Sequence, residues 1–112
     1  MGKLTTHVLD ISRGVGAAGV NISVYREGIL IGRSATNREG RVSAPLASGD
    51  SFTAGGYRLE FGIGEYFARH KDPDARRFLD VVPIEFRVDD PSGDYHVPLL
   101  VSPWSYTTYR GS

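Results

Sequence analysis

The feature that most constrains the fold is a period of two in the apolar side chains, which recurs along most of the chain. In Tyr57–Phe61, for example, the apolar residues alternate with Arg58 and Glu60. Successive side chains of a strand point to opposite faces, so this pattern predicts strands with one buried face. The same alternation predicts further strands at Leu4–Asp10, Val20–Tyr25, Ile29–Ser34, Arg41–Leu46, Ile84–Asp89, Tyr95–Ser102 and Ser105–Arg110.

One segment breaks this alternation. Glu65–Lys71 contains good helix formers and is followed by Pro73, so it predicts a single short helix. About eight short strands separated by Gly-, Pro- and Asp-rich turns are typical of a β-sandwich. We therefore expect an all-β sandwich with one short helix, formed as a single domain over residues 1–112.

Composition limits the possible partners and compartments. The 13 Lys and Arg residues balance the 13 Asp and Glu residues, which argues against a nucleic-acid partner and against an anionic membrane surface. The chain has no cysteine, which favours a reducing compartment. The first residues contain no signal-peptide-like apolar run, and no segment reaches transmembrane length. We expect a cytoplasmic protein, with the periplasm as the alternative.

A glycine motif at Gly14–Gly19 matches the G-x-G-x-x-G pattern of dinucleotide-binding sites. Such a site needs a helix that begins at the third glycine, so that the helix N-terminus meets the pyrophosphate. The residues that follow, Val20–Val24, alternate and are largely β-branched. The segment is therefore predicted to be a loop between strands, and no nucleotide cofactor is expected.

Two histidines are candidates for catalysis. His7 lies in the first predicted strand and His96 in a late strand, each on a face that is otherwise small or apolar. A single histidine of this kind is more often a hydrogen-bonded structural residue. Two imidazoles that meet can act as a general acid–base pair near neutral pH. The third histidine, His70, lies between Arg69 and Lys71 and is predicted to be a solvated surface residue.

These histidines and Arg41 could also form a metal site or an anion site. Histidine is a common metal ligand, but the chain has no cysteine and no carboxylate at short spacing from His7 or His96, so no metal is expected. Arg41 follows Gly40 at the start of a predicted strand. Its side chain is either a surface charge or a planar fork for an anionic or carbonyl-rich ligand, and the pattern leaves both open.

Five motifs are distributed along the chain: LTTHVLD at Leu4–Asp10, EGR at Glu39–Arg41, GEYF at Gly64–Phe67, YHVPLLVSP at Tyr95–Pro103 and YRGS at Tyr109–Ser112. Together they resemble the transthyretin-related 5-hydroxyisourate hydrolase family. The resemblance covers the whole chain and is most specific near its C-terminal end. The chain departs from the family pattern at Phe78–Asp80, where Phe-Phe-Pro is common, and in the turn at Gly14–Ala17.

The resemblance implies a transthyretin-like sandwich that pairs edge strands into dimers, with two dimers stacked as a homotetramer. The sites would lie in the channel between the dimers, and we expect an apolar patch that includes Leu99 and Val101 or their neighbours to form the stacking surface. The implied reaction is the hydrolytic ring opening of 5-hydroxyisourate, a cyclic amide, in urate breakdown. No metal, cofactor or covalent nucleophile is required.

The resemblance also implies the residue roles, although which histidine is the base stays open. Two other functions of the same fold are a small-ligand carrier and a non-catalytic interaction module. A channel with two histidines and two arginines would be a poor lining for an apolar ligand, and an interaction module has no need of YRGS. The implied catalytic residues are His7, Arg41, His96 and Ser112, and the implied substrate contacts are His7, Arg41, Tyr109, Arg110 and Gly111.

Overall fold

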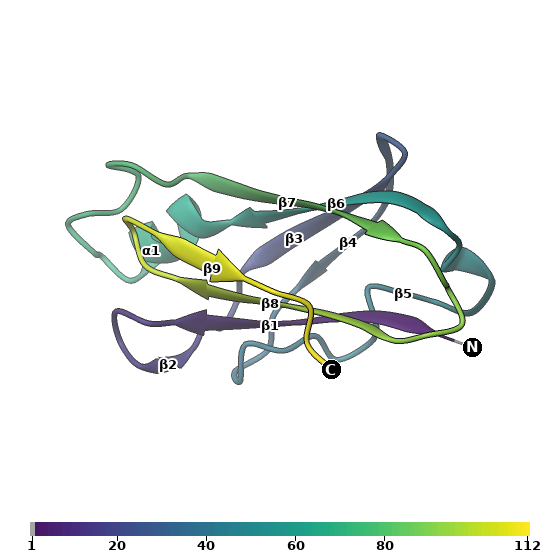
Figure 1. Cartoon of the computed structure of the whole chain (residues 1–112). Coiled ribbons are helices and arrows are strands. Elements are labelled where there is room, and N and C mark those ends of the chain that lie inside the picture. The colour runs from purple at the N-terminus through teal and green to yellow at the C-terminus, as the bar shows by residue number, and fades with distance from the viewer. Residues whose placement is uncertain (1) are drawn as a thin grey trace.

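The computed structural model describes residues 2–112, which form two stacked sheets (Figure 1). The first, called sheet A, has the strand order β2-β1-β8-β9, with β5 also paired to β1, and the second, sheet B, has the order β4-β3-β6-β7. The strands of sheet A are β1 (Lys3–Asp10), β2 (Val15–Gly16), β5 (Ala47–Ser48), β8 (Tyr95–Val101) and β9 (Tyr106–Thr108). The strands of sheet B are β3 (Asn21–Arg26), β4 (Ile29–Ala35), β6 (Gly55–Gly62) and β7 (Val81–Val88).

The alternating apolar residues form one core between the two sheets. Leu4 and Val8 of β1 and Leu59 and Phe61 of β6 are all fully buried. The predicted sandwich and the inward faces of these strands are therefore confirmed. The residues between them on β1, including His7, point to the outer face of sheet A, away from this core.

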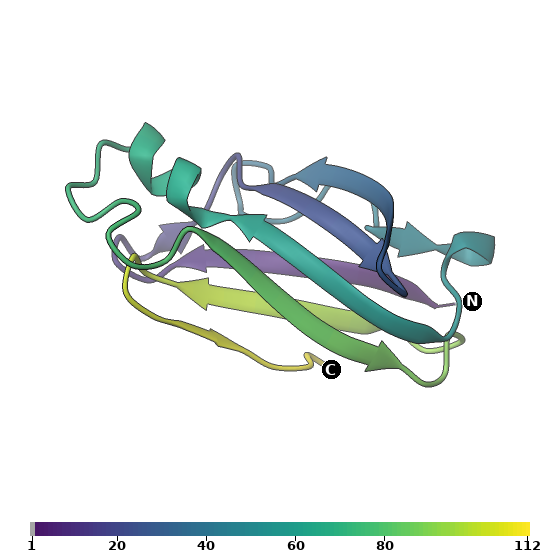
Figure 2. The ribbon, with the colours of Figure 1, turned by 90° about the horizontal axis from the view of Figure 1, so that it is seen from above.

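The helix α1 (Ile63–Arg69) directly follows β6 and covers one end of the sandwich (Figure 2). The predicted helix is confirmed, although it begins earlier than expected, at Ile63. The structure adds one short 3-10 helix, Gly49–Ser51, that the sequence pattern did not indicate. No helix within residues 2–112 is long and apolar enough to cross a membrane.

Strand β1 is hydrogen-bonded along both of its edges. On one edge it runs parallel to β8. On the other edge, three short segments follow one another: β5 pairs with the start of β1, Arg41 forms an isolated bridge with His7, and β2 pairs with the end. The two ends of the sequence are thus brought together in the middle of sheet A.

Two predictions about strands need correction. The strand expected at Arg41–Leu46 is wrong, because this range makes only two separate contacts with β1: Arg41 forms a bridge with His7, and the N–H of Leu46 donates a hydrogen bond to the carbonyl oxygen of Leu4 just before β5. The alternation there has another cause, since Val42 and Leu46 pack against the core. The last strand is shorter than Ser105–Arg110, ending at Thr108.

For the expected apolar stacking patch, the structure excludes Leu99 and Val101 and leaves their neighbours. Leu99 and Val101 are both fully buried and face the core. Their neighbours in β8, Pro98 and Leu100, lie on the outer face with His96, as a strand's alternation requires. Any contact made by this face of sheet A therefore uses those neighbours instead.

The glycine segment Gly14–Gly19 connects β1 to β3 and contains β2. It leads into a strand rather than a helix, which confirms the prediction of a loop between strands. Gly16 is packed closely, because a Cβ at this position would lie 2.2 Å from the carbonyl oxygen of Glu39. The segment thus rests against the turn that carries Arg41.

Candidate active site

The outer face of sheet A brings together Arg41, His7 and His96. Thr5 and His96 are partners in the parallel β1–β8 ladder, and their side chains meet, with 2.9 Å between Thr5 Oγ1 and His96 Nδ1. His7 lies on the same face of β1 as Thr5, and Arg41 is its partner across the other edge. Residues directly opposite in a bridge project to the same face. The three side chains therefore form a row across the sheet.

The ring of His7 is held by the turn before Arg41. Its Nε2 lies 2.9 Å from the carbonyl oxygen of Glu39. A carbonyl oxygen only accepts hydrogen bonds, so Nε2 carries the proton and donates it. In neutral His7, Nδ1 is then the nitrogen with the free lone pair.

The turn that presents Arg41 explains the glycine of the EGR motif. The side-chain oxygen of Asn37 accepts a hydrogen bond of 3.1 Å from the backbone N–H of Arg41. Gly40 has φ 80°, and a Cβ there would lie 2.2 Å from the carbonyl oxygen of Val8. Only glycine meets both conditions without strain. The turn is thereby pressed against β1, with Arg41 beside His7.

His96 is enclosed from both sides. On one side is the hydroxyl of Thr5, and on the other is Gly111, whose N–H donates a 2.7 Å hydrogen bond to the carbonyl oxygen of His96. A Cβ on Gly111 would lie only 2.7 Å from Cδ2 of the His96 ring. The glycine of YRGS therefore makes room for the imidazole.

The surroundings of His96 favour its neutral form. Burial lowers the pKa of His96 below its usual value, and the positive charges of Arg41 and His7 lower it further. Within residues 2–112, no residue forms a hydrogen bond to its Nε2. A neutral imidazole with a free ring nitrogen can accept a proton near neutral pH.

The remaining predicted residues do not join this row within the single chain. The guanidinium of Arg110 lies 4.0 Å from the ring centroid of Tyr95, and it donates a 3.0 Å hydrogen bond to the carbonyl oxygen of Asp94. Tyr95 and His96 are consecutive in β8, so their side chains project to opposite faces. Tyr109 and Arg110 line a cavity of about 260 Å³ beside β7 and β9.

Ser112 is exposed at the end of the chain. The hydrogen bonds of the described residues do not connect it to His7, Arg41 or His96. The roles of Tyr109, Arg110 and Ser112 at the site stay predictions, and so does a substrate contact by Gly111.

Three contributors to the site were not identified from the sequence. Thr5 was not singled out, because its partner His96 lies 91 residues away. The contact from Glu39 is made by its backbone carbonyl group, which every residue has, so the sequence does not indicate it. The Asn37 side chain carried a weak signal, since asparagine is common in turns.

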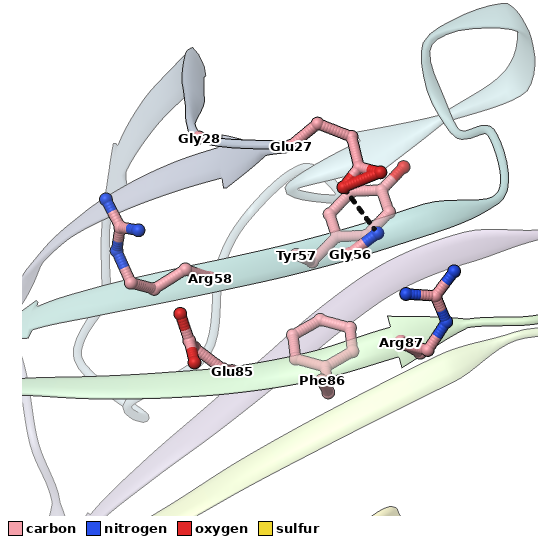
Figure 3. Close-up of a pocket in the computed structure, with 8 residues that line it drawn as sticks. All are labelled: Glu27, Gly28, Gly56, Tyr57, Arg58, Glu85, Phe86 and Arg87. Carbon is pink, nitrogen blue, oxygen red and sulfur yellow. Dashed lines mark hydrogen bonds between the residues drawn. The ribbon is translucent and has the colours of Figure 1, made fainter.

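Another cavity lies elsewhere on the molecule. It has a volume of about 600 Å³ and contains none of the row residues (Figure 3). Its charged side chains alternate in sign, with Arg58 opposite Glu85 across β6 and β7, as is common for a solvated sheet surface. The lining residues are Glu27, Gly28, Gly56, Tyr57, Arg58, Glu85, Phe86 and Arg87.

Two histidines on one face could also be ligands of a metal ion. Among residues 2–112, no three His, Cys, Asp or Glu side chains are grouped so that they could hold one ion. The two histidines of the row instead contact a carbonyl oxygen and a hydroxyl. The arrangement is suited to proton transfer next to a fixed positive charge.

The chain is similar in sequence and structure to known proteins. Its sequence matches the model of the HIUase/Transthyretin family over residues 4–111. The chain belongs to this family. The family resemblance and the transthyretin-like sandwich expected from the motifs are thereby confirmed.

Relatives within the family are similar over the full chain. The 5-hydroxyisourate hydrolase of Ralstonia nicotianae is 48% identical, with 100% of both chains covered. The structure of the 5-hydroxyisourate hydrolase of Klebsiella pneumoniae is 36% identical, with a TM-score of 0.87 and 100% of both chains covered. A crystal structure of an (S)-allantoin synthase is 44% identical, with a TM-score of 0.93 and 99% of this chain covered, but this chain spans only 44% of that protein.

Proposed function

We propose that this chain is a 5-hydroxyisourate hydrolase, which opens a cyclic amide with water during urate breakdown. The observation that carries the proposal is the row of Arg41, His7 and His96 on the outer face of sheet A. Full-length relatives that bear this name support it. The family description alone does not, because it covers transthyretin as well.

His96 is the proton acceptor in this proposal. Its Nε2 takes a proton from water as the water oxygen attacks the ring carbonyl carbon of the substrate. The tetrahedral intermediate then breaks its C–N bond, and His96 returns the proton to the departing nitrogen. The reaction consumes one water molecule, and it yields a carboxyl group and an N–H group on the opened ring.

Arg41 and His7 assist this step. The guanidinium of Arg41 has a fork of donors that can hold substrate oxygens and stabilise the negative charge that develops on the attacked carbonyl. The ring of His7, fixed through Nε2 by the carbonyl of Glu39, presents Nδ1 to the site. Tyr109, Arg110, Gly111 and Ser112 are proposed to complete the pocket through contacts between subunits.

The test adds the protein to freshly generated 5-hydroxyisourate and follows the decay of its ultraviolet absorbance. We expect clear acceleration over buffer. His96→Asn should lower turnover by about 10²-fold or more, because it removes the acid–base group but keeps much of the side chain's size. His70→Asn is the matched control, since His70 is exposed and bonds Arg13 at the end of α1.

Two results would contradict the proposal. Decay at the buffer rate would remove the hydrolase assignment and leave a carrier of the same fold as the alternative. Near-full activity of His96→Asn would remove the histidine mechanism while keeping the activity.

Assembly and location are part of the same proposal. We infer a homotetramer built as a dimer of dimers, supported by β9, whose three side chains are all exposed at the edge of sheet A and include no lysine. We also infer a cytoplasmic location, which fractionation of cells that express the protein would test.

A further inference from the structure

The hydrogen bond between Thr5 and His96 has no part in the reaction as described so far. Thr5 is half-buried in β1, and its Oγ1 lies 2.9 Å from Nδ1 of His96. Two arrangements satisfy this distance. Either the hydroxyl donates to a bare Nδ1, or a protonated Nδ1 donates to the hydroxyl oxygen.

The two arrangements differ in what Nε2 of neutral His96 carries, which is a proton in the first and a lone pair in the second. If the hydroxyl donates, neutral His96 carries its proton on Nε2, and the only lone pair of the ring is turned toward Thr5. If Nδ1 donates, the lone pair is on Nε2, which has no hydrogen bond to any of residues 2–112. The bond made by one ring nitrogen thus sets the state of the other.

Only the second arrangement fits a ring that accepts and returns a proton at Nε2. In that case Nδ1 remains protonated in both the neutral and the charged ring. The bond to Thr5 then persists throughout the reaction, and no side chain has to turn. Gly111 packs closely against the ring of His96, because a Cβ at this position would lie only 2.7 Å from Cδ2. The ring therefore has little space to move away from Thr5.

We propose that Thr5 is a positioning residue that accepts a hydrogen bond from Nδ1–H of His96 and so keeps Nε2 free to accept the proton. The catalytic part of this inference rests on the proposed hydrolase function. The tautomer itself is a property of the resting protein and can be measured without substrate.

The chain contains a matched control on the next residue. Thr6 Oγ1 donates a 2.7 Å hydrogen bond to the carbonyl oxygen of Val97, so it also joins β1 to β8. Thr6 faces the core and is only 2% exposed, and its hydroxyl does not contact a histidine. Thr6→Val therefore removes a comparable link between the same two strands on the other face of the sheet.

The experiment combines nitrogen NMR of labelled histidine side chains with turnover measurements on the intact protein. In the wild type we expect the His96 signals of a protonated Nδ1 and a bare Nε2. Thr5→Val should lose this single tautomer and lower kcat by about 10-fold or more, a part of the usual contribution of general base catalysis, with less change in KM. Thr5→Ser should restore the wild-type tautomer and kcat, and Thr6→Val should leave the tautomer and kcat unchanged.

Other results would overturn either the inference about Thr5 or the proposed function. A wild-type His96 with its proton on Nε2 overturns the inference, whatever the activity. A Thr5→Val protein with the wild-type tautomer and kcat overturns it too, and Thr5→Ala replaces Thr5→Val if the valine variant fails to fold. If the wild type does not open 5-hydroxyisourate, the proposed function fails, but the wild-type tautomer still decides the assignment of the hydrogen bond.

Discussion

At the scale of single residues, the proposed reaction depends on how much of His96 is neutral. Burial and the charges of Arg41 and His7 lower its pKa from the ordinary 6.5. The basic form therefore persists below that pH. We predict that the acid-side decline of kcat/KM is centred below pH 6.5. A decline centred above pH 6.5, with the protein still folded, would contradict this assignment.

Arg41 affects both the rate and this pH dependence. Arg41→Gln removes one of the charges that lower the pKa of His96, so the acid-side decline should move to higher pH. It should also reduce kcat by about 10²-fold, as loss of an oxyanion donor does. Arg41→Lys keeps the charge but not the fork, so it should reduce kcat while leaving the pH profile in place. Equal profiles for wild type and Arg41→Gln would show that Arg41 does not act on His96.

At the scale of elements, the turn after β1 is anchored to α1 through a buried carboxylate. Asp10 is fully buried; its Oδ1 accepts from Ser12 and from the N–H of Arg13, while its Oδ2 accepts a 2.8 Å hydrogen bond from the hydroxyl of Tyr66. Burial, followed by the hydrogen bond to Asp10 and the charge of Asp10, raises the pKa of Tyr66 to about 12. The last residue of the LTTHVLD motif is thus structural.

Removal of this hydroxyl should destabilise the fold without changing the chemistry. We predict that Tyr66→Phe lowers the free energy of unfolding by about 1–3 kcal/mol, because a buried carboxylate oxygen loses its donor. Denaturant unfolding measures the change. Tyr25→Phe serves as the control, since the hydroxyl of Tyr25 has no hydrogen bond to the described residues. Equal losses for the two variants would contradict an anchoring role for Asp10.

The segment after β9 acts on the site through Gly111. We predict that Gly111→Ala lowers kcat by about 10²-fold, because the added methyl group displaces the His96 ring from its place against Thr5. Gly32→Ala is the control, as a Cβ there has no atom within 4 Å. If Gly111→Ala keeps wild-type kcat, the ring of His96 is not held by this segment.

The strand faces were predictable from sequence, but the pairing between strands was not. Alternation predicted which residues share a face with His7 and which share a face with His96, because that pattern is local and needs only the period of a strand. That both histidines lie on the outer face of sheet A was seen only in the structure. The contact of Arg41 with His7 depends on how three segments share one edge of β1, and local alternation wrongly extended it into a strand. The motif resemblance supplied the residue set, whereas the direction of Arg110 toward Tyr95 required the structure.

At the scale of the whole molecule, activity should depend on assembly. The exposed edge strand β9 and the outer face of sheet A are both available to other subunits. We predict a homotetramer by light scattering and loss of specific activity when dilution lowers the tetramer fraction. A monomer that retains full activity at assay concentration would contradict a site shared between subunits.

The parallel pairing of β1 with β8 also has a consequence for how the molecule folds. Thr5 and His96 are neighbours in the ladder although 91 residues separate them. Long-range pairing of this kind requires closure of a loop that includes almost the entire chain, and such topologies fold slowly. A growing polypeptide cannot form the row of Arg41, His7 and His96 until β8 has been synthesised. Recovery of activity during refolding should therefore require two late events, the docking of β8 against β1 and the assembly of the subunits.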